Sequence, residues 1–127
     1  MNDKNLHNEK LDVMVVTRPW GYFEQFTQNR TSTVKIITVN PYRRLSLQSH
    51  RYRDEFWYCI DNRVNAIVGD QEYRLSEGDS IFIPRETKHR IEGLDVVGKV
   101  LEISLGEFYE EDITRYQDDF SRTTISK

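Results

Sequence analysis

The feature that most constrains this chain is a succession of short runs rich in β-branched and aromatic residues, separated by turn-forming residues. Such runs recur at intervals typical of an all-β domain. Turn signals lie between them, including Asn40–Pro41 and Glu77–Asp79. Gly69–Asp70 is flanked by two such runs and predicts a tight hairpin. We therefore expect about ten strands, in VMVV, GYFEQF, TVKIITV, LSLQSH, EFWYCI, VNAIV, EYRL, SIFIP, HRIEG and VVGKVLEISL.

The length of 127 residues predicts a single domain. Only 37% of the residues are hydrophobic and 31% are charged, which favours a small barrel or sandwich over a helical bundle. We expect a polar N-terminal arm at 1–12, the barrel domain at 13–122 and a C-terminal tail at 123–127. Near its end the domain becomes acidic, and the imperfect apolar pattern of 107–120 fits either a short helix or an extended segment packed on the barrel.

Charge and cysteine content narrow the function classes. A formal net charge of -3, with acids and bases interspersed, predicts neither nucleic-acid nor membrane partners. The single cysteine, Cys59, lies inside an apolar run, so we expect a buried thiol and a reducing compartment. The first residues lack the apolar stretch of a signal peptide, and no segment has the length of a membrane span. We expect a cytoplasmic protein.

Four residues form a candidate metal site. Gln48 and His50 are two apart on a predicted strand, so their side chains leave from the same face. Glu55 opens the next strand, and a hairpin would return it beside them. His89 follows Pro84 at the start of a later strand. Each residue alone could be an ordinary surface group, but together they supply two imidazoles, a carboxylate and an amide oxygen. This donor set suits a divalent ion with open coordination positions.

Long stretches of the chain resemble the type II mannose-6-phosphate isomerases, which are cupins and often form the C-terminal half of bifunctional enzymes with a mannose-1-phosphate guanylyltransferase. The resemblance covers about residues 18–122 and rests on RPWGYFEQF, VKIITVNPYRRLSLQSHRYRDEFWYCI, LSEGDSIFIPRETKHRIEG and LEISLGEFYEEDITRYQDDFSR. It implies an all-β double-stranded β-helix (jelly-roll) barrel, with one divalent metal bound by Gln48, His50, Glu55 and His89. Zinc is the expected ion, with manganese, cobalt or nickel as alternatives. The implied activity interconverts mannose 6-phosphate and fructose 6-phosphate.

The chain departs from the family's pattern in several places. The family usually has a run of histidines where this chain has His50, Arg51 and Tyr52, so only one histidine is kept there. Glycines usual in the family are replaced by Tyr42 and Asn62. Asparagine tolerates left-handed backbone, whereas the tyrosine could alter the barrel mouth. No guanylyltransferase half precedes the domain in this sequence, so we do not expect nucleotide-sugar synthesis from it.

An aldose–ketose isomerase also needs a base for proton transfer and cations for the phosphate and the enediolate. For the base we expect Glu102, a carboxylate within an apolar strand; a solvent-facing Glu102 is the alternative. The first choice for the cationic role is Arg53, which matches the arginine of the family's signature. Lys35 is a further catalytic candidate, and Lys88 and Arg115 are further substrate-binding candidates.

Other functions stay open at this point. Cupin barrels host many activities, so the chain could be a sugar-binding or regulatory cupin without turnover. It could also be another metal-dependent cupin enzyme, such as an isomerase of a different sugar or an oxygenase. Trp20, Trp57 and Tyr58 could line a sugar pocket or pack in the core. A homodimer formed through a strand edge is expected.

Overall fold

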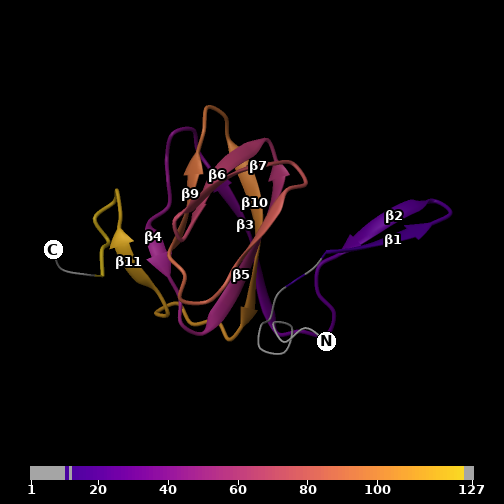
Figure 1. Cartoon of the computed structure of the whole chain (residues 1–127), viewed down its shortest axis with the longest axis horizontal. Coiled ribbons are helices and arrows are strands. Elements are labelled where there is room, and N and C mark those ends of the chain that lie inside the picture. The colour runs from indigo at the N-terminus through magenta and orange to yellow at the C-terminus, as the bar shows by residue number, and fades with distance from the viewer. Residues whose placement is uncertain (1–10, 12, 125–127) are drawn as a thin grey trace.

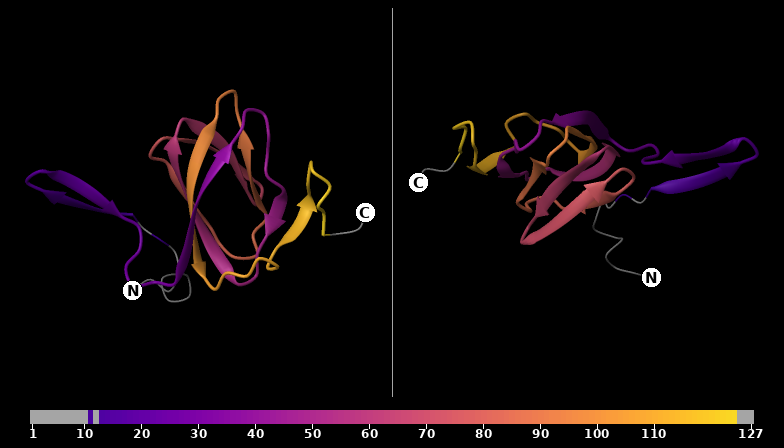
Figure 2. Two further views of the ribbon diagram at one scale, coloured as in Figure 1. Left: turned by 180° about the vertical axis from the view of Figure 1, so that it is seen from behind. Right: turned by 90° about the horizontal axis from the view of Figure 1, so that it is seen from above.

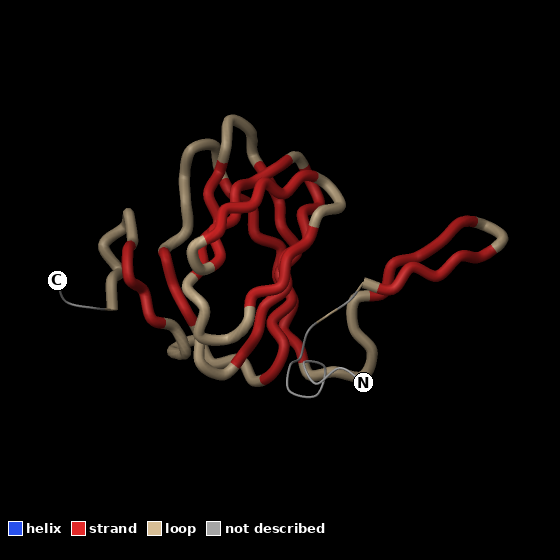
Figure 3. Tube along the Cα trace, viewed as in Figure 1, coloured by secondary structure: helices blue, strands red, loops and turns tan. Residues whose placement is uncertain are grey.

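The computed structural model describes residues 11 and 13–124, and all of their regular structure is β. This part of the chain contains no helix, and therefore no helix long and apolar enough to cross a membrane. Residues 1–10 of the expected arm and 125–127 of the expected tail lie outside the described residues. The strands are drawn in red in Figure 3. They are β1 Met14–Arg18, β2 Gly21–Gln25, β3 Ser32–Val39, β4 Leu47–Ser49, β5 Arg53–Asp61, β6 Arg63–Val68, β7 Gln71–Ser76, β8 Ser80–Ile83, β9 His89–Gly93, β10 Gly98–Gly106 and β11 Thr114–Gln117.

Two antiparallel sheets face one another and form the barrel (Figure 1, Figure 2). One sheet has the order β3-β10-β5-β8 and the other β11-β4-β9-β6-β7. All ten runs picked out in the sequence form strands, which confirms the all-β prediction. The eleventh strand lies in the acidic stretch at 107–120, so the extended alternative is correct there and the helical one is wrong. Val68 pairs with Gln71 across Gly69–Asp70, as the hairpin signal predicts.

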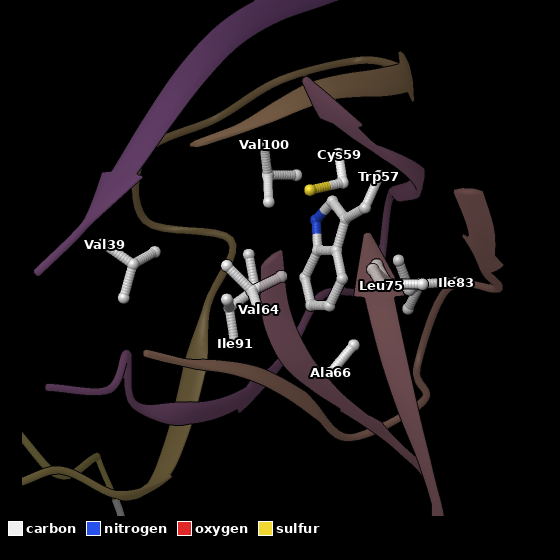
Figure 4. Close-up of a cluster of buried hydrophobic side chains, with 9 residues drawn as sticks. All are labelled: Val39, Trp57, Cys59, Val64, Ala66, Leu75, Ile83, Ile91 and Val100. Carbon is white, nitrogen blue, oxygen red and sulfur yellow. The ribbon is translucent and has the colours of Figure 1, made fainter. Parts of the chain in front are cut away.

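The inner face of the barrel changes from apolar to polar along its axis. Glu55, Trp57 and Cys59 are alternate residues of β5, so all three point into the barrel. On β10 the partner of Cys59 is Val100 and the partner of Trp57 is Glu102. We call the apolar half the apolar end (Figure 4). It consists of Val39, Trp57, Cys59, Val64, Ala66, Leu75, Ile83, Ile91 and Val100, and it buries the Cys59 thiol as expected.

A second apolar layer covers the outside of the four-stranded sheet. Its buried members are Leu11, Phe56, Ile103 and Leu105, and Phe26 packs against them. Because alternate residues of a strand face opposite sides, Phe56 and Ile103 point outward where Glu55 and Glu102 point inward. The β1–β2 hairpin, beyond this layer, projects away from the barrel (Figure 1, Figure 2).

Tyr42 and Asn62, which replace glycines usual in the resembled family, both have left-handed backbone. Their φ angles are 60° and 55°. This conformation costs most residues about 1–2 kcal/mol, whereas asparagine visits it readily. Asn62 also donates its side-chain amide to the carbonyl of Val97 at 2.9 Å, which secures its turn. The Tyr42 ring is 79% exposed and offsets little of the strain.

Candidate metal centre and active site

Three buried side chains converge at the polar end of the barrel interior. His50 directly follows β4, Glu55 lies in β5 and His89 is the first residue of β9. Their candidate ligand atoms all lie within 4.8 Å of one another. Glu55 Oε2 is 3.4 Å from His50 Nε2, and Glu55 Oε1 is 3.2 Å from His89 Nε2. Two strands and a strand end from both sheets therefore bring together donors that are far apart in sequence.

The hydrogen bonds of the two imidazoles define which nitrogen faces the centre. His50 Nδ1 lies 2.7 Å from the carbonyl oxygen of Asp112, and His89 Nδ1 lies 2.8 Å from that of Thr87. A carbonyl oxygen can only accept, so we assign the ring hydrogens to both Nδ1 atoms. In the neutral rings the Nε2 atoms then present lone pairs to the centre. Burial lowers the pKa of His50, which favours this neutral form.

The resulting donor set fits a divalent cation. Two Nε2 lone pairs face the carboxylate of Glu55, which also has only lone pairs to offer. His89 Nε2 and Glu55 Oε1 are buried, and neither has a hydrogen-bond partner among the described residues. Buried polar atoms without partners cost free energy, and a metal ion between them would satisfy all three side chains. The carbonyl groups behind the imidazoles would fix the orientation of these ligands.

Gln48, the fourth expected ligand, lies at the edge of this centre. It pairs with His89 in the β4–β9 ladder and lines the same cavity as Glu55. Its side-chain nitrogen donates to Ser46 Oγ at 2.9 Å. That bond fixes the amide, so the carbonyl oxygen is the atom that Gln48 would offer to a metal. Its role as a ligand stays a prediction.

A cavity of about 240 Å³ adjoins these side chains. Two larger hollows, of about 470 and 480 Å³, are lined by none of the three converging residues. The smaller cavity mixes cations with carboxylates, as a charged and hydroxylated ligand requires. It is lined by Lys35, Ile37, Leu45, Ser46, Gln48, Arg53, Glu55, Glu102, Phe108, Glu110, Ile113, Arg115 and Arg122.

Glu102 faces this cavity from the middle of the four-stranded sheet. β10 lies between β3 and β5, so the alternative of a solvent-facing Glu102 on an edge strand is wrong. Its side chain is buried, and its Oε2 accepts a hydrogen bond from Trp57 Nε1 at 3.1 Å. Burial, followed by the negative charge of Glu55, raises the pKa of Glu102 to about 7.

The neighbouring carboxylate behaves in the opposite way. Burial acts to raise the pKa of Glu55, but the imidazoles of His89 and His50 in their protonated forms and the permanently charged guanidinium of Arg53 outweigh it. The net effect lowers the pKa of Glu55 to about 2. One cavity therefore contains a permanently ionised carboxylate beside one that can exchange a proton near neutrality, the arrangement expected of a ligand and a base.

Two of the expected cations meet on one aromatic ring. The guanidinium of Arg53 lies 4.2 Å from the ring centroid of Phe108, and the ammonium of Lys35 lies 4.5 Å from it. Arg53 Nε also donates to Glu55 Oε2 at 3.0 Å. Arg53 is buried and touches the candidate metal ligands, and its place at the cavity wall is fixed by Phe108.

The remaining cationic candidates differ in position. Arg115 pairs with Gln48 across the β11–β4 ladder and lines the cavity. Its Nε is buried with no hydrogen-bond partner in the described part of the chain. Lys88 instead is exposed and lies over the ring of Tyr116 at 4.3 Å, outside the cavity lining. The structure thus brings Arg115 to the cavity and leaves Lys88 away from it.

The aromatic candidates for a sugar pocket also lie elsewhere. Trp57 packs in the apolar end and contacts the site through its ring nitrogen, which donates to Glu102, and through its ring, whose centroid lies 5.5 Å from that of His89. Tyr58 packs on the outer layer and donates to Glu24 at 2.9 Å. Trp20 is 73% exposed, next to the projecting hairpin's strands. None of the three is among the described residues that line the cavity.

Two residues of the site escaped the sequence analysis. Asp112 accepts hydrogen bonds from the backbone nitrogens of Arg51 and Tyr52 at 2.8 and 3.0 Å, and its own carbonyl holds His50. Phe108 carries the two cations described above. Both lie in the acidic stretch at 107–120, where we expected packing on the barrel and, among site residues, Arg115 alone. No local motif links this stretch to His50, so only the folded chain could place it over the site.

Comparison with known proteins agrees with this architecture. The family model described as "Mannose-6-phosphate isomerase C-terminal" matches residues 2–118. The xanthan biosynthesis protein XanB of Xanthomonas campestris pv. campestris is 34% identical over 110 residues, which are 85% of this chain and 24% of that protein. The mannose-1-phosphate guanylyltransferase RfbM of Salmonella typhimurium is 32% identical over 118 residues, 91% of this chain and 24% of that protein. The chain thus spans about a quarter of the length of these relatives.

A solved structure supports the fold. A cupin protein from Bacteroides fragilis aligns with a TM-score of 0.55 at 17% identity, covering 64% of this chain and 74% of that one. A likeness at such low identity concerns the fold alone. Together with the family match, it identifies the barrel as the cupin jelly roll that the resemblance implied. The chain therefore belongs to the family of the mannose-6-phosphate isomerase C-terminal domain.

Proposed function

We propose that this domain is a metal-dependent aldose–ketose isomerase that interconverts mannose 6-phosphate and fructose 6-phosphate. The observation that carries the proposal is Glu102, a buried carboxylate with its pKa raised to about 7, in the same cavity as the cluster of His50, Glu55 and His89. A base that titrates near neutrality beside a candidate metal centre suits proton transfer next to a carbonyl group. Family membership supports the choice of sugar phosphate as substrate.

His50, Glu55 and His89 would hold one divalent ion, with Gln48 as a fourth ligand. Zinc is proposed because two neutral imidazoles and a carboxylate suit it, and manganese, cobalt and nickel are the alternatives. When bound, the ion supplies Lewis-acid polarisation of the substrate carbonyl. The fixed Nδ1 hydrogen bonds of both histidines would keep the ligands in place between turnovers.

Glu102 is proposed to move the proton between carbons 1 and 2 of the sugar. Its carboxylate would take the proton from one carbon and return it to the other, which requires a pKa close to ambient pH. The hydrogen bond from Trp57 Nε1 engages Oε2 and fixes the plane of the carboxylate. Lys35 pairs with Glu102 across the β3–β10 ladder and places a positive charge nearby for the enediolate.

The cationic residues would bind different parts of the substrate. Arg53, fixed against Phe108 and Glu55, lies where enediolate charge would develop. Arg115 is proposed to bind the phosphate, because its buried Nε lacks a partner at the cavity wall. Lys88 would reach the phosphate only by leaving the ring of Tyr116, so we give it the smaller role.

We also propose a reducing, cytoplasmic setting, which the buried thiol of Cys59 suits. The partner that the site itself supports is a small-molecule sugar phosphate.

A coupled fructose-6-phosphate assay on metal-replete and chelated protein tests the proposal. We expect turnover only with metal. The Glu102→Gln variant should lose at least about 100-fold in turnover while it retains the metal. Sugar-phosphate binding to the metal-replete protein without turnover would favour the sugar-binding alternative. If the chelated protein turned over substrate as fast as the metal-replete protein, the metal role would be contradicted. Turnover of a different sugar, with none of fructose 6-phosphate, would point to another cupin isomerase.

A further inference from the structure

The β1–β2 hairpin forms a two-stranded sheet of its own, separate from both sheets of the barrel. β1 and β2 pair only with each other in the described part of the chain, and the hairpin projects from the barrel (Figure 1, Figure 2). It is attached at its base through Phe26, which packs on the outer layer, and through Glu24, which accepts a hydrogen bond from Tyr58 at 2.9 Å. An isolated two-stranded hairpin is marginally stable at best in water, so this one needs a further surface.

The hairpin carries large apolar side chains that the described part of the protomer leaves partly or largely exposed. Trp20, Tyr22 and Phe23 are 73%, 64% and 37% exposed, and Met14 and Val15 are 54% and 59% exposed. At about 200 Å² for a fully exposed aromatic side chain, the three aromatic residues alone leave roughly 350 Å² open to solvent. A standard protein interface covers about 800 Å² on each partner, so these residues supply a large share of one.

A matching surface lies on the barrel itself. β3 is the edge strand of its sheet, and its outer edge pairs with no strand in the described residues. Val34 and Ile36 on this strand are 57% and 60% exposed. They continue the apolar outer face of the sheet, because they pair with Ile103 and Leu101, which the outer layer covers. Among the described residues, the cover thus stops at β3 and leaves the outer edge of its backbone and the side chains of Val34 and Ile36 without a partner.

We propose that the hairpin of one copy packs against the β3 edge of a second copy, and that the second copy does the same in return. This arrangement goes beyond the proposed function and does not depend on it. Within the described residues, each copy has a hairpin that no further strand supports and, at β3, an apolar sheet edge with no strand beside it, so a two-fold exchange satisfies both needs in a closed dimer. It also removes an edge that would otherwise recruit other chains.

Light scattering coupled to size-exclusion chromatography tests the proposal across protein concentrations. We expect a dimer for the unmodified chain. The hairpin variant Trp20→Ser/Tyr22→Ser and the edge variant Val34→Asp/Ile36→Asp should each weaken association at least 100-fold and run as monomers. All four side chains are exposed in the protomer, so the far-ultraviolet circular dichroism should stay close to that of the unmodified chain. Tyr73→Ser, at a 40% exposed tyrosine on β7, is the matched control and should remain dimeric.

Mixing the two variants identifies the contact. In a mixed dimer the edge variant keeps a native hairpin and the hairpin variant keeps a native β3, so one of the two contacts is intact. Native mass spectrometry should therefore detect mixed dimers where each variant alone is monomeric. A contact between two hairpins, or between two β3 edges, would not be restored in this way. If the edge variant fails to fold, Ile36→Ser replaces it.

Several outcomes would overturn the proposal. One is a monomeric unmodified chain at tens of micromolar, which would leave the hairpin to a different occupant. Another is a dimer that both variants leave intact. A third is the absence of mixed dimers when the two variants are combined.

Discussion

The two ends of the barrel interior are built on the same strands but do different work. At the apolar end, side chains such as Val100, Cys59 and Ile91 are fully buried in one hydrophobic cluster. At the polar end, Glu55 and Glu102 are nearly as buried but are bound by charged or polar partners. The difference shows that one half supplies folding free energy while the other spends some of it to hold buried charge in place.

The largest expected effect comes from substitutions that disrupt the candidate metal site at the polar end and leave the apolar end intact. The variants His50→Ala and His89→Ala should lose the metal, as measured by elemental analysis, and about 1000-fold or more in turnover. The far-ultraviolet circular dichroism should stay close to that of the unmodified protein, because the apolar end remains intact. Full metal content in both variants would disprove the proposed ligand set, and a collapsed spectrum on chelation would show that the metal is structural.

The converse change breaks the apolar end. Ile91→Ala removes a fully buried side chain and should lower the free energy of unfolding by about 2–5 kcal/mol in urea titrations. The metal content of the folded fraction should be unaltered, since Ile91 lies among apolar neighbours. A parallel loss of metal from the folded protein would show that the two ends do not behave independently.

Arg53→Ala sharpens the comparison within the polar end. Arg53 donates to Glu55 and lies against Phe108, beside the place where substrate charge would develop. We expect turnover to fall about 100-fold with metal content unchanged, as for the loss of one transition-state donor. An effect confined to the Michaelis constant would indicate phosphate binding instead. Turnover within about threefold of the unmodified protein would transfer the cationic role to Lys35 or Arg115.

Trp57 joins the two ends, because its ring packs in the apolar end and its Nε1 donates to Glu102. Trp57→Phe keeps most of the packing but removes the donor to a buried carboxylate, which typically costs about 1.5–3 kcal/mol. We expect a moderate loss of stability together with about tenfold lower turnover. Loss of stability without any change in kinetics would show that Trp57 does not position Glu102.

The smallest expected effect comes from a substitution at Tyr42, which belongs to neither end. Tyr42→Gly should raise the free energy of unfolding by roughly 0.5–1 kcal/mol, because glycine adopts the φ of 60° without strain while it also gains freedom in the unfolded chain. Thermal melts measure the change, and activity should stay the same. Asn62→Gly is the control and should shift the melt less, since Asn62 bonds Val97. A destabilised Tyr42→Gly protein would mean that the tyrosine ring contributes packing.

Much of the site could be predicted because it follows strand order. His89 is the first residue of β9 and Glu55 lies near the start of β5, and the sequence marks both strands clearly. The alternation of side chains along β5 then fixes which of its residues face inward. Glu102 was the harder case, because alternation cannot tell the inside of a barrel from its outside. Its burial depends on β10 lying between two other strands, which is a matter of pairing.

The acidic stretch at 107–120 marks the limit of such reasoning. Its composition indicated a segment packed on the barrel, and β11 does pair with β4. That Asp112 would hold the backbone after His50, and that Phe108 would carry Arg53 and Lys35, could not be foreseen from spacing. These contacts join residues more than 50 positions apart, and no local pattern encodes them.

The sequence by itself determined the all-β class, the strand positions and the group of metal-ligand candidates, because turn chemistry, alternation and residue type are local properties. The tertiary structure decided which of these groups meet and in what protonation state. The pKa of Glu102 is raised while that of its neighbour Glu55 is lowered, although both are glutamates on neighbouring strands. The physical reason is that burial and nearby charge set a pKa, and both are properties of the folded chain.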